Sequence, residues 1–577
     1  MTFSQWLLFF LFVQIVHFMG TWKLYKAAGY QSWQAAIPIY NAILLMKIIK
    51  RPTWWVILLF IPTINLILVG VIWVETMRSF RKNTTKDTAL VLITFGFYLF
   101  SVNYSKDPKY QPDRSLRPKT GIGETVSSIL FAVVAATIVH NYVIQPYIIP
   151  TGSLEKSLLI GDFLFVSKFH YGARVPMTAV SVPMVHDTIP GVKIRSYLKK
   201  PQIPYLRLPG LQKIERNEIV VFSWPADTVR QFFVREKRVD KPIDKKSNYV
   251  KRCVGIPGDT LEIKEGFVYT NGLKNELPER AEVQYTHFAY ANKGVSSRSL
   301  LKEGFEDFNR TYKIENITEN SYQQILPYII GRTGNTVENF RVITEGKGLP
   351  TEVVRKANLR VSEILEVKKE MTLTLEEADK LRKANGIDSV VRRINTSKIP
   401  NEAFFPNKIP YDWNEDTFGP IVIPKKGMTV ELNRSNLALY KKIIDEYEEN
   451  ELELTPNEIK INGTATEQYT FKKDYYWMMG DNRHKSEDSR FWGFVPDDHI
   501  VGKPIFIWFS IKGINDGVKN WSIRWDRVFT TVDGPGARFS YFPYFVVVLL
   551  LWQGWVIYRR KKIKPQHDPA AMPSLFT

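Results

Sequence analysis

The chain contains one cysteine in 577 residues, Cys253, and only eight histidines. A single cysteine excludes an intramolecular disulfide framework. The histidines are scattered and no two stand at the spacing of metal ligands, so we expect no metal site. The sequence also lacks a helix-turn-helix, a zinc-finger spacing and an RNA-binding signature, and we therefore expect no nucleic-acid partner.

A strongly basic balance is present instead, with a net charge of +20. With nucleic acid disfavoured, an anionic membrane surface is the expected neighbour. At 577 residues the chain is too long for one compact core, so two or more domains are expected. Apolar stretches gather near both ends of the chain, whereas the middle is polar and charged.

Two apolar runs predict membrane-spanning helices on either side of the polar middle. Residues 125–144 carry no formal charge over about the length needed to cross a bilayer. The second run is Tyr541–Tyr558. Both runs have basic flanks, formed by Arg114, Arg117 and Lys119 before the first and by Arg559, Arg560, Lys561 and Lys562 after the second. Because basic flanks stay in the cytoplasm, the block from about 146 to 540 is expected on the far side, tethered at both ends.

The first hundred residues contain shorter or interrupted apolar segments. Gln5–Met19 and Trp54–Val74 have the pattern of spanning helices, and Thr88–Val102 is borderline in length. Ala35–Met46 is short and contains proline and asparagine, which indicates an interfacial or re-entrant segment. Basic residues occur in every connecting loop, so charge does not determine the orientation here. The Ile-Pro-Ile-Tyr-Asn start at 37–41 and a following Trp-Trp pair resemble an uncharacterised multi-pass membrane domain, which implies no chemistry.

The polar middle shows both strand and helix patterns. Ile219–Phe222 and Thr260–Ile263 are short apolar or alternating runs bounded by turn residues, and they predict strands. Leu375–Asn385 and Leu437–Glu449 have helical spacing of apolar residues, and Thr374 is the expected N-cap of the first. The long stretch from 280 to 455 is expected to be an insertion with its own α+β structure.

The most distinctive stretch is residues 480–493, Gly-Asp-Asn-Arg-His-Lys-Ser-Glu-Asp-Ser-Arg-Phe-Trp-Gly. It has no apolar period, so it can neither bury one face of a helix nor form a half-buried strand. We expect a polar loop held by its own hydrogen bonds. Loops that are rich in convergent polar groups usually build sites.

Two upstream segments supply a candidate nucleophile and a candidate base. Gly152 allows a sharp turn that would present the hydroxyl and the N–H of Ser153 at one point. Lys251 lies in an apolar strand that ends in a Pro-Gly turn. Burial lowers the pKa of a lysine, and a neutral amine can take the proton of a serine hydroxyl. The pattern predicts a Ser-Lys dyad that needs no histidine.

Each segment by itself also has an ordinary structural explanation. Ser153 could be a turn residue, and Lys251 could be an edge-strand lysine that points to water. Cys253 fits a small buried apolar residue, and His170 and His484 fit solvated loop histidines. The occurrence of all three segments, in order, on the translocated side of a membrane helix favours the catalytic interpretation.

The three segments together resemble type I signal peptidase, also called leader peptidase. The resemblance covers about residues 122–272 and 474–512, with a weaker match at 216–222. It implies a membrane-anchored, mainly-β catalytic domain, the signal-peptidase-like β fold, with α-helical transmembrane segments at both ends. The multi-pass N-terminal region and the α+β insertion are additions to that pattern.

The resemblance also implies a role for each matching residue. Ser153 would be the nucleophile and Lys251 the general base. Thr151 would donate to the oxyanion hole, and Ser486 would orient the lysine amine. The remaining matches are supporting residues (Arg252, Gly480, Asp481, Asp488 and Arg490, with a salt-bridge network among Arg252, Asp488 and Arg490) and residues of the shallow substrate pockets (Tyr147, Ile149, Pro150, Leu154, Tyr249 and Val250).

The sequence departs from the family pattern at a few positions. Leu154 stands where methionine is usual, Lys156-Ser157 where Pro-Thr is usual, and Asn217-Glu218 where Gly-Asp is usual. The first change keeps an apolar wall and the others fall outside the reacting atoms. They bear on fine specificity more than on activity.

The expected domain organisation follows from these segments. It comprises an N-terminal multi-pass membrane region with a cytoplasmic loop (1–121), an anchor helix (122–146), an extracytoplasmic β catalytic domain (147–279 and 456–535), the α+β insertion (280–455), a C-terminal transmembrane helix (541–558) and a basic cytoplasmic tail (559–577).

The expected function is that of a membrane-bound serine endopeptidase that removes N-terminal signal peptides at small-x-small sites. The expected partners are exported preproteins, the lipid bilayer and the secretion translocon, and the resemblance implies no cofactor. The expected location is the bacterial inner membrane, with the catalytic domain on the periplasmic or extracytoplasmic side.

Two alternatives are open from the residues alone. A self-cleaving Ser-Lys repressor shares the dyad, but it needs a DNA-binding head where this chain has apolar segments. A catalytically inactive membrane scaffold or chaperone could use the same peptide groove, and a preprotein cleavage assay distinguishes it.

Overall fold

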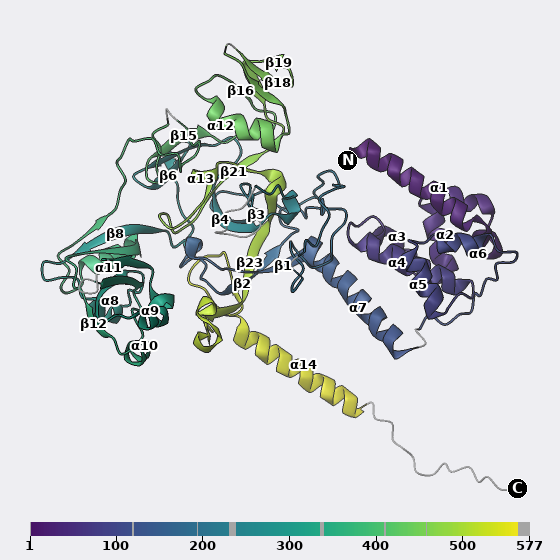
Figure 1. Ribbon diagram of the computed structural model, residues 1–577, viewed down its shortest axis with the longest axis horizontal. Coiled ribbons are helices and arrows are strands. Elements are labelled where there is room, and N and C mark those ends of the chain that lie inside the picture. The colour runs from purple at the N-terminus through teal and green to yellow at the C-terminus, as the bar shows by residue number, and fades with distance from the viewer. Residues whose placement is uncertain are drawn as a thin grey trace, which may run out of the picture.

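The computed structural model describes residues 2–117, 120–192, 194–229, 238–334, 340–408, 411–456 and 458–562. Figure 1 shows a helical N-terminal unit on one side of a central sheet and a group of smaller sheets on the other side. A long C-terminal helix projects from the centre.

The N-terminal unit is built from short helices that follow one long helix. Its elements are α1 (Phe3–Ala27), a 3-10 turn (Ser32–Ala36), α2 (Tyr40–Ile48), α3 (Trp55–Leu58), α4 (Ile64–Ser79), α5 (Thr85–Ile93) and α6 (Tyr98–Asn103). The helix expected at Gln5–Met19 is confirmed and is longer at both ends.

The two other expected helices of this unit are each divided, so those predictions are wrong. Trp54–Val74 falls on α3 and α4, because the chain turns around Pro62 and Thr63 has a φ of 71°. Thr88–Val102 falls on α5 and α6, with Gly96 in the left-handed region at a φ of 84°. A side chain on Gly96 would collide with the ring of Trp73, so the turn packs directly on α4.

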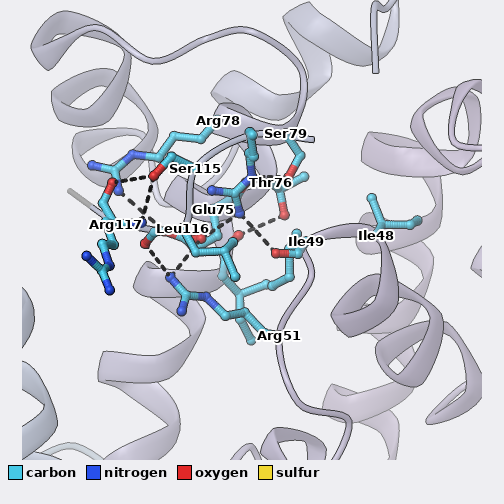
Figure 2. Close-up of polar contacts among 12 residues, drawn as sticks. Ile48, Ile49, Arg51, Glu75, Thr76, Arg78, Ser79, Ser115, Leu116 and Arg117 are labelled. Carbon is cyan, nitrogen blue, oxygen red and sulfur yellow. Dashed lines mark hydrogen bonds and ion pairs between the residues drawn. The ribbon is translucent and has the colours of Figure 1, made fainter. Parts of the chain in front are cut away.

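A buried glutamate joins three segments of the N-terminal unit (Figure 2). Glu75 of α4 accepts hydrogen bonds from Arg51 at 3.1 Å, Arg78 at 3.3 Å and Arg114 at 2.6 Å. Arg114 also donates to the backbone carbonyl of Ile49. A buried carboxylate needs such compensation, and here it holds the segment that leads to the next long helix against α2 and α4.

Three helices among the described residues are long and apolar enough to cross a membrane. They are α1, the α7 segment (α7, Gly121–Ile138, continued by a π-helical turn at Val139–Val143) and α14 (Phe542–Lys562). The two spans expected at 125–144 and Tyr541–Tyr558 are therefore confirmed as helices. Of the basic residues expected beside them, Lys119 and the side chains of Arg560, Lys561 and Lys562 lie outside the described residues, as does the tail 563–577.

The central sheet contains nine strands over the described part of the chain, and the main path has the order β1-β2-β23-β3-β4-β21-β22. Its members are β1 (Ile144–Ile148), β2 (Asp162–Ser167), β3 (Ile219–Ser223), β4 (Asn248–Gly255), β21 (Tyr475–Met479), β22 (Val495–Pro496) and β23 (Ile500–Lys512), with β24 (Ser522–Ile523) and β25 (Thr530–Thr531) beside β23. The strand expected at Ile219–Phe222 is confirmed as β3 and is buried along its whole length.

A four-stranded sheet continues from the central strands. It consists of β15 (Phe418–Val422), β5 (Thr260–Lys264), β6 (Phe267–Thr270) and β7 (Leu273–Lys274), and it confirms the strand expected at Thr260–Ile263. Two smaller sheets lie nearby, formed by β16 (Thr429–Glu431) with β20 (Gln468–Thr470) and by β17 (Leu452–Leu454), β18 (Ile459–Ile461) and β19 (Thr464–Ala465).

The rest of the expected insertion forms two α+β groups. The first contains β8 (Gln284–Tyr290), α8 (Ser297–Lys302), β13 (Lys368–Thr374), α11 (Leu375–Arg382) and β14 (Ser389–Arg392); the second contains β9 (Asn309–Glu315), α9 (Glu319–Ile325), β10 (Gly331–Thr333), β11 (Phe340–Glu345), α10 (Thr351–Lys356) and β12 (Arg360–Glu363). The helix expected at Leu375–Asn385 is confirmed, with Thr374 as its N-cap.

The part of the expected insertion after residue 404 shares a core with the catalytic strands. Phe405, Phe418 and Tyr440 pack in one cluster with Val254 of β4 and Trp477 of β21. The helix expected at Leu437–Glu449 is present as α12 (Leu437–Lys442), which continues into a π-helical turn at Ile443–Tyr447. The domain bounds proposed from the sequence stay predictions. Those bounds assign α12 to the insertion, whereas its packing joins it to the core of the catalytic strands.

Candidate active site

The loop between β1 and β2 carries Ser153. The chain leaves β1 and forms a 3-10 turn at Gly152–Leu154, so Ser153 lies half-buried at a sharp bend. Asn482 of the polar loop fixes this turn, because its backbone N–H donates to the Ser153 carbonyl at 3.1 Å and its side-chain amide donates to the Gly152 carbonyl at 3.2 Å. The candidate nucleophile is thus held by a segment more than three hundred residues away.

Lys251 lies on the central strand β4, between β3 and β21. Its amine nitrogen Nζ is 2.5 Å from Oγ of Ser153, so the side chain extends from β4 to the turn at Gly152–Leu154. The residue is only 4% exposed. The predicted nucleophile and base are therefore brought into hydrogen-bond contact, with the lysine buried and the serine half-buried.

Burial lowers the pKa of Lys251 to about 8, although the nearby carboxylates of Asp488, Glu487 and Asp481 oppose the shift. Desolvation disfavours the ammonium form, and the carboxylates favour it. An amine with such a pKa is neutral in a useful fraction near neutral pH. The site can therefore hold a basic amine beside a hydroxyl, which is the arrangement that general-base activation of serine requires.

Gly480 is in direct contact with the nucleophile turn. A Cβ atom at this position would stand 2.5 Å from the carbonyl oxygen of Ser153 and would also collide with Ser486. The Gly480 N–H donates to the carboxylate of Asp488 at 3.0 Å. Oγ of Ser486 is buried and has no hydrogen-bond partner among the described residues, so the bond to Lys251 expected from the resemblance is not formed.

Two buried ion pairs support the loop. Arg252, next to Lys251, makes a two-pronged pair with Asp481 at 2.6 and 2.7 Å. Asp488 pairs with Arg490 at 2.8 and 2.9 Å. The guanidinium groups help to hold the pKa of each carboxyl below its ordinary value against the opposing effect of burial. The partner of Arg252 is therefore Asp481. The resemblance implied one salt-bridge network among Arg252, Asp488 and Arg490, whereas the structure has two separate ion pairs.

The residues expected to line the substrate pockets divide between two apolar clusters. Ile149 and Leu154 are buried together with Leu164 and Val221, and Tyr147 and Val250 pack at the edge of the same cluster. Tyr249 belongs to a second cluster, where its ring stacks on Trp224 at 4.9 Å. Pro150 and Thr151 are exposed at the entrance to the turn.

The structure contradicts the expectation of a solvated histidine at position 484. The side chain of His484 is 3% exposed. Its Nδ1 accepts from the backbone N–H of Thr286 at 3.0 Å, and Nε2 lies 3.0 Å from a carboxylate oxygen of Asp416. His170 is half-buried and bonds to Ser167. His484 therefore links the polar loop to β8 and to the segment before β15, a contact that no sequence pattern indicated.

One group among the described residues has the composition of a metal site, formed by Glu415, Asp416 and His484. The backbone N–H of Thr286 occupies Nδ1 of the histidine, so Nε2 carries the proton and donates to Asp416. Glu415 is paired with Arg393. Because these hydrogen bonds occupy the potential ligand atoms, the group serves as a structural junction.

Comparison with known proteins relates this site to a protease family. The model of the family "Signal peptidase, peptidase S26" matches residues 122–384 and 420–509, which is more than half of the chain. Residues 33–113 match a family of unknown function, DUF5684.

Several bacterial proteins are similar to the chain. Signal peptidase I of Buchnera aphidicola from Acyrthosiphon pisum is 23% identical over 71% of this chain and 82% of that protein. Signal peptidase I of Haemophilus influenzae is 21% identical over 72% of this chain and 78% of that protein. The Pseudomonas aeruginosa enzyme of the same name is 28% identical over 26% of this chain and 37% of its own length. With its mainly-β catalytic sheet and its apolar terminal helices, the chain belongs to the signal peptidase family, peptidase S26.

Proposed function

We propose that this protein is a membrane-bound serine endopeptidase that uses Ser153 as nucleophile and Lys251 as general base to remove signal peptides from exported preproteins. The observation that carries the proposal is the 2.5 Å contact between the Lys251 amine and the Ser153 hydroxyl, with the amine buried. The family of the chain supplies the reaction class.

In the proposed reaction, Oγ of Ser153 attacks the carbonyl carbon of the scissile bond while Nζ of Lys251 takes the hydroxyl proton. The carbon–nitrogen bond then breaks, and the lysine returns that proton to the departing amine. The signal peptide is left as an ester on Ser153. Lys251 next takes a proton from water as the resulting hydroxide attacks the ester carbonyl. The bond from the carbonyl carbon to Oγ then breaks, Lys251 returns the proton to Oγ of Ser153, and the signal peptide leaves as a carboxylic acid that ionises in water.

The turn at Gly152–Leu154 supports an oxyanion hole at the Ser153 backbone N–H, with Thr151 as the side-chain donor. Thr151 is exposed, so its hydroxyl is free to turn toward a substrate carbonyl. Ser486 is proposed to orient the lysine amine in the reacting state, because its buried Oγ makes no hydrogen bond among the described residues and is available for that contact.

The cluster that contains Ile149 and Leu154 supports a preference for small residues beside the cut. Its buried members are branched aliphatic residues, among them Ile149, Leu154, Leu164 and Val221. A substrate in extended conformation would lie along this face and add a strand to the sheet edge, with its alternate side chains entering the pockets. We propose small-x-small cleavage sites on this basis.

The test is cleavage of a preprotein by the full-length protein in detergent. Ser153→Ala and Lys251→Ala should each reduce cleavage at least about 1,000-fold, because each removes one half of the dyad. His170→Ala, a half-buried histidine outside the dyad, serves as the control and should retain cleavage. Substantial turnover by the lysine variant would exclude the dyad, whereas no cleavage by the wild type would favour a non-catalytic use of the groove.

The protein is membrane-anchored, and we propose the bacterial inner membrane with the catalytic sheet outside the cytoplasm. The α7 segment leads directly into β1, so the C-terminal end of this helix lies on the same side of the membrane as the catalytic sheet. The indole of Trp6, near the start of α1, donates to the Gln202 carbonyl at 3.0 Å, and Thr63, before α4, contacts Ser181. These contacts support an N-terminus on the same side of the membrane as the catalytic sheet, with Glu75 and its arginine partners on the opposite side.

Labelling with a membrane-impermeant maleimide tests this orientation. The native Cys253 is fully buried and gives a low background. Ser4→Cys and Ala465→Cys should react in intact spheroplasts, and Ser105→Cys only after permeabilisation. If only Ser105→Cys reacts in intact spheroplasts, the orientation is the opposite of the one proposed.

A further inference from the structure

A cavity of about 830 Å³ opens between the polar loop and the segments around Phe405 and α12. Ser486, Glu487 and Trp492 form its wall on the catalytic side. Phe405 and Ala438 contribute to the opposite wall. None of the side chains assigned to the signal-peptide pockets lines this cavity.

Ser486 links the cavity to the nucleophile turn. A Cβ on Gly480 would meet both the Ser153 carbonyl and Ser486, so Ser486 lies close to that turn and also lines the cavity. Glu487, the next residue of the polar loop, lines the same wall. If the signal-peptide side of the substrate occupies the Ile149–Leu154 cluster, the chain beyond the cut bond leads toward the cavity.

Trp492, which lines the cavity, carries a buried hydrogen-bond donor. Nε1 of Trp492 is buried and has no partner among the described residues, although the residue is only 6% exposed. Its ring is fixed, because it packs edge-on against Tyr249 at 5.6 Å and Trp224 at 6.1 Å. A buried donor without a partner is costly, and a peptide carbonyl is a suitable acceptor for it.

The charged groups around the cavity are of both signs. Lys441 and Lys442 stand on α12, and Asp445 and Glu446 follow in the next turn. Glu487 faces them from the polar loop. Such a wall gives no preference for one charge, whereas main-chain groups are common to every peptide. The chemistry therefore suits an extended peptide of variable sequence.

We infer that this cavity binds the first residues of the mature protein, on the far side of the scissile bond, and that Trp492 donates to a main-chain carbonyl there. This inference rests on the proposed signal-peptidase function and assigns the cavity to the leaving part of the same substrate. Bound mature residues would hold the scissile bond against Ser153 before cleavage and would leave with the new amino terminus.

Two substrates with the same signal-peptide segment separate this inference from the function itself. One is an ester with no residue after the cleaved bond, and the other is a peptide amide with six mature residues. The ratio of kcat/KM for the long substrate over the short one should fall roughly tenfold in Trp492→Phe, which keeps an aromatic side chain and removes the donor. A similar fall is expected in Ala438→Trp, which fills the cavity from α12.

Ala465→Trp is the matched control, because Ala465 lies exposed on β19 and outside the cavity. A fall of the ratio in either cavity variant, beyond that of the control, supports the inference. A ratio within twofold of the wild type in both variants overturns it. Turnover of the short substrate by the wild type and its loss in Ser153→Ala report separately on the proposed function.

Discussion

Gly480 lies so close to Ser153 that a single added methyl group would stand 2.5 Å from the serine carbonyl oxygen. The two residues are brought together because the polar loop folds over the nucleophile turn, where Asn482 bonds to both Gly152 and Ser153. The position therefore tolerates no side chain, whatever the backbone conformation.

Gly480→Ala should displace the nucleophile turn from Lys251. We expect preprotein cleavage to fall at least about 100-fold, because a misplacement of about 1 Å in reacting groups has that effect. Steady-state kinetics in detergent measures the loss. Gly554→Ala is the control, since a Cβ there meets nothing within 4 Å. Equal activity of the two variants would show that the contact is not important for catalysis.

The rate of cleavage should rise with pH. The pKa of Lys251 is lowered to about 8, and only the neutral amine can accept the serine proton. kcat/KM should therefore increase about tenfold per pH unit below 8 and level off above it. A pH profile on an ester substrate tests this. A rate that stays constant between pH 6 and 9 would exclude a lysine base with this pKa.

Asp481→Asn should destabilise the fold. The substitution leaves the buried Arg252 guanidinium without its counter-charge, and breaking a buried pair from one side costs about 3–5 kcal/mol. Thermal unfolding in detergent should show a clear fall in Tm. The partly exposed pair between Glu262 and Lys264 provides the comparison, and Glu262→Gln should cost less than about 1 kcal/mol. Similar Tm shifts in both variants would contradict a special role for the buried pair.

Cys253 should be unreactive in the folded protein. The thiol is fully buried on β4, and burial raises its pKa, so little thiolate forms and no reagent reaches it. Treatment with N-ethylmaleimide at pH 7 should leave cleavage activity unchanged and add no mass to the native protein. The same treatment in denaturant should add one label per chain. Rapid labelling of the native protein would show that β4 opens.

Local patterns were sufficient to predict the elements whose signal lies in a short stretch of chain. The uncharged run at 125–144 and the run Tyr541–Tyr558 are helices, because twenty or so apolar residues have few other stable arrangements. The β3 strand and the N-cap of α11 were also predictable, since both depend on neighbouring residues. The order of the three polar motifs indicated the family, although each motif alone was ambiguous.

Contacts between distant segments were decided only by the tertiary structure. The partner of Arg252 is Asp481 in preference to Asp488, although both carboxylates occur in the same loop. His484 is buried because β8 supplies a backbone donor to it. The division of the N-terminal helices depends on the packing of turns such as Gly96 on Trp73. Local hydropathy and turn preference act over a few residues, whereas these pairings depend on which surfaces meet when the whole chain packs.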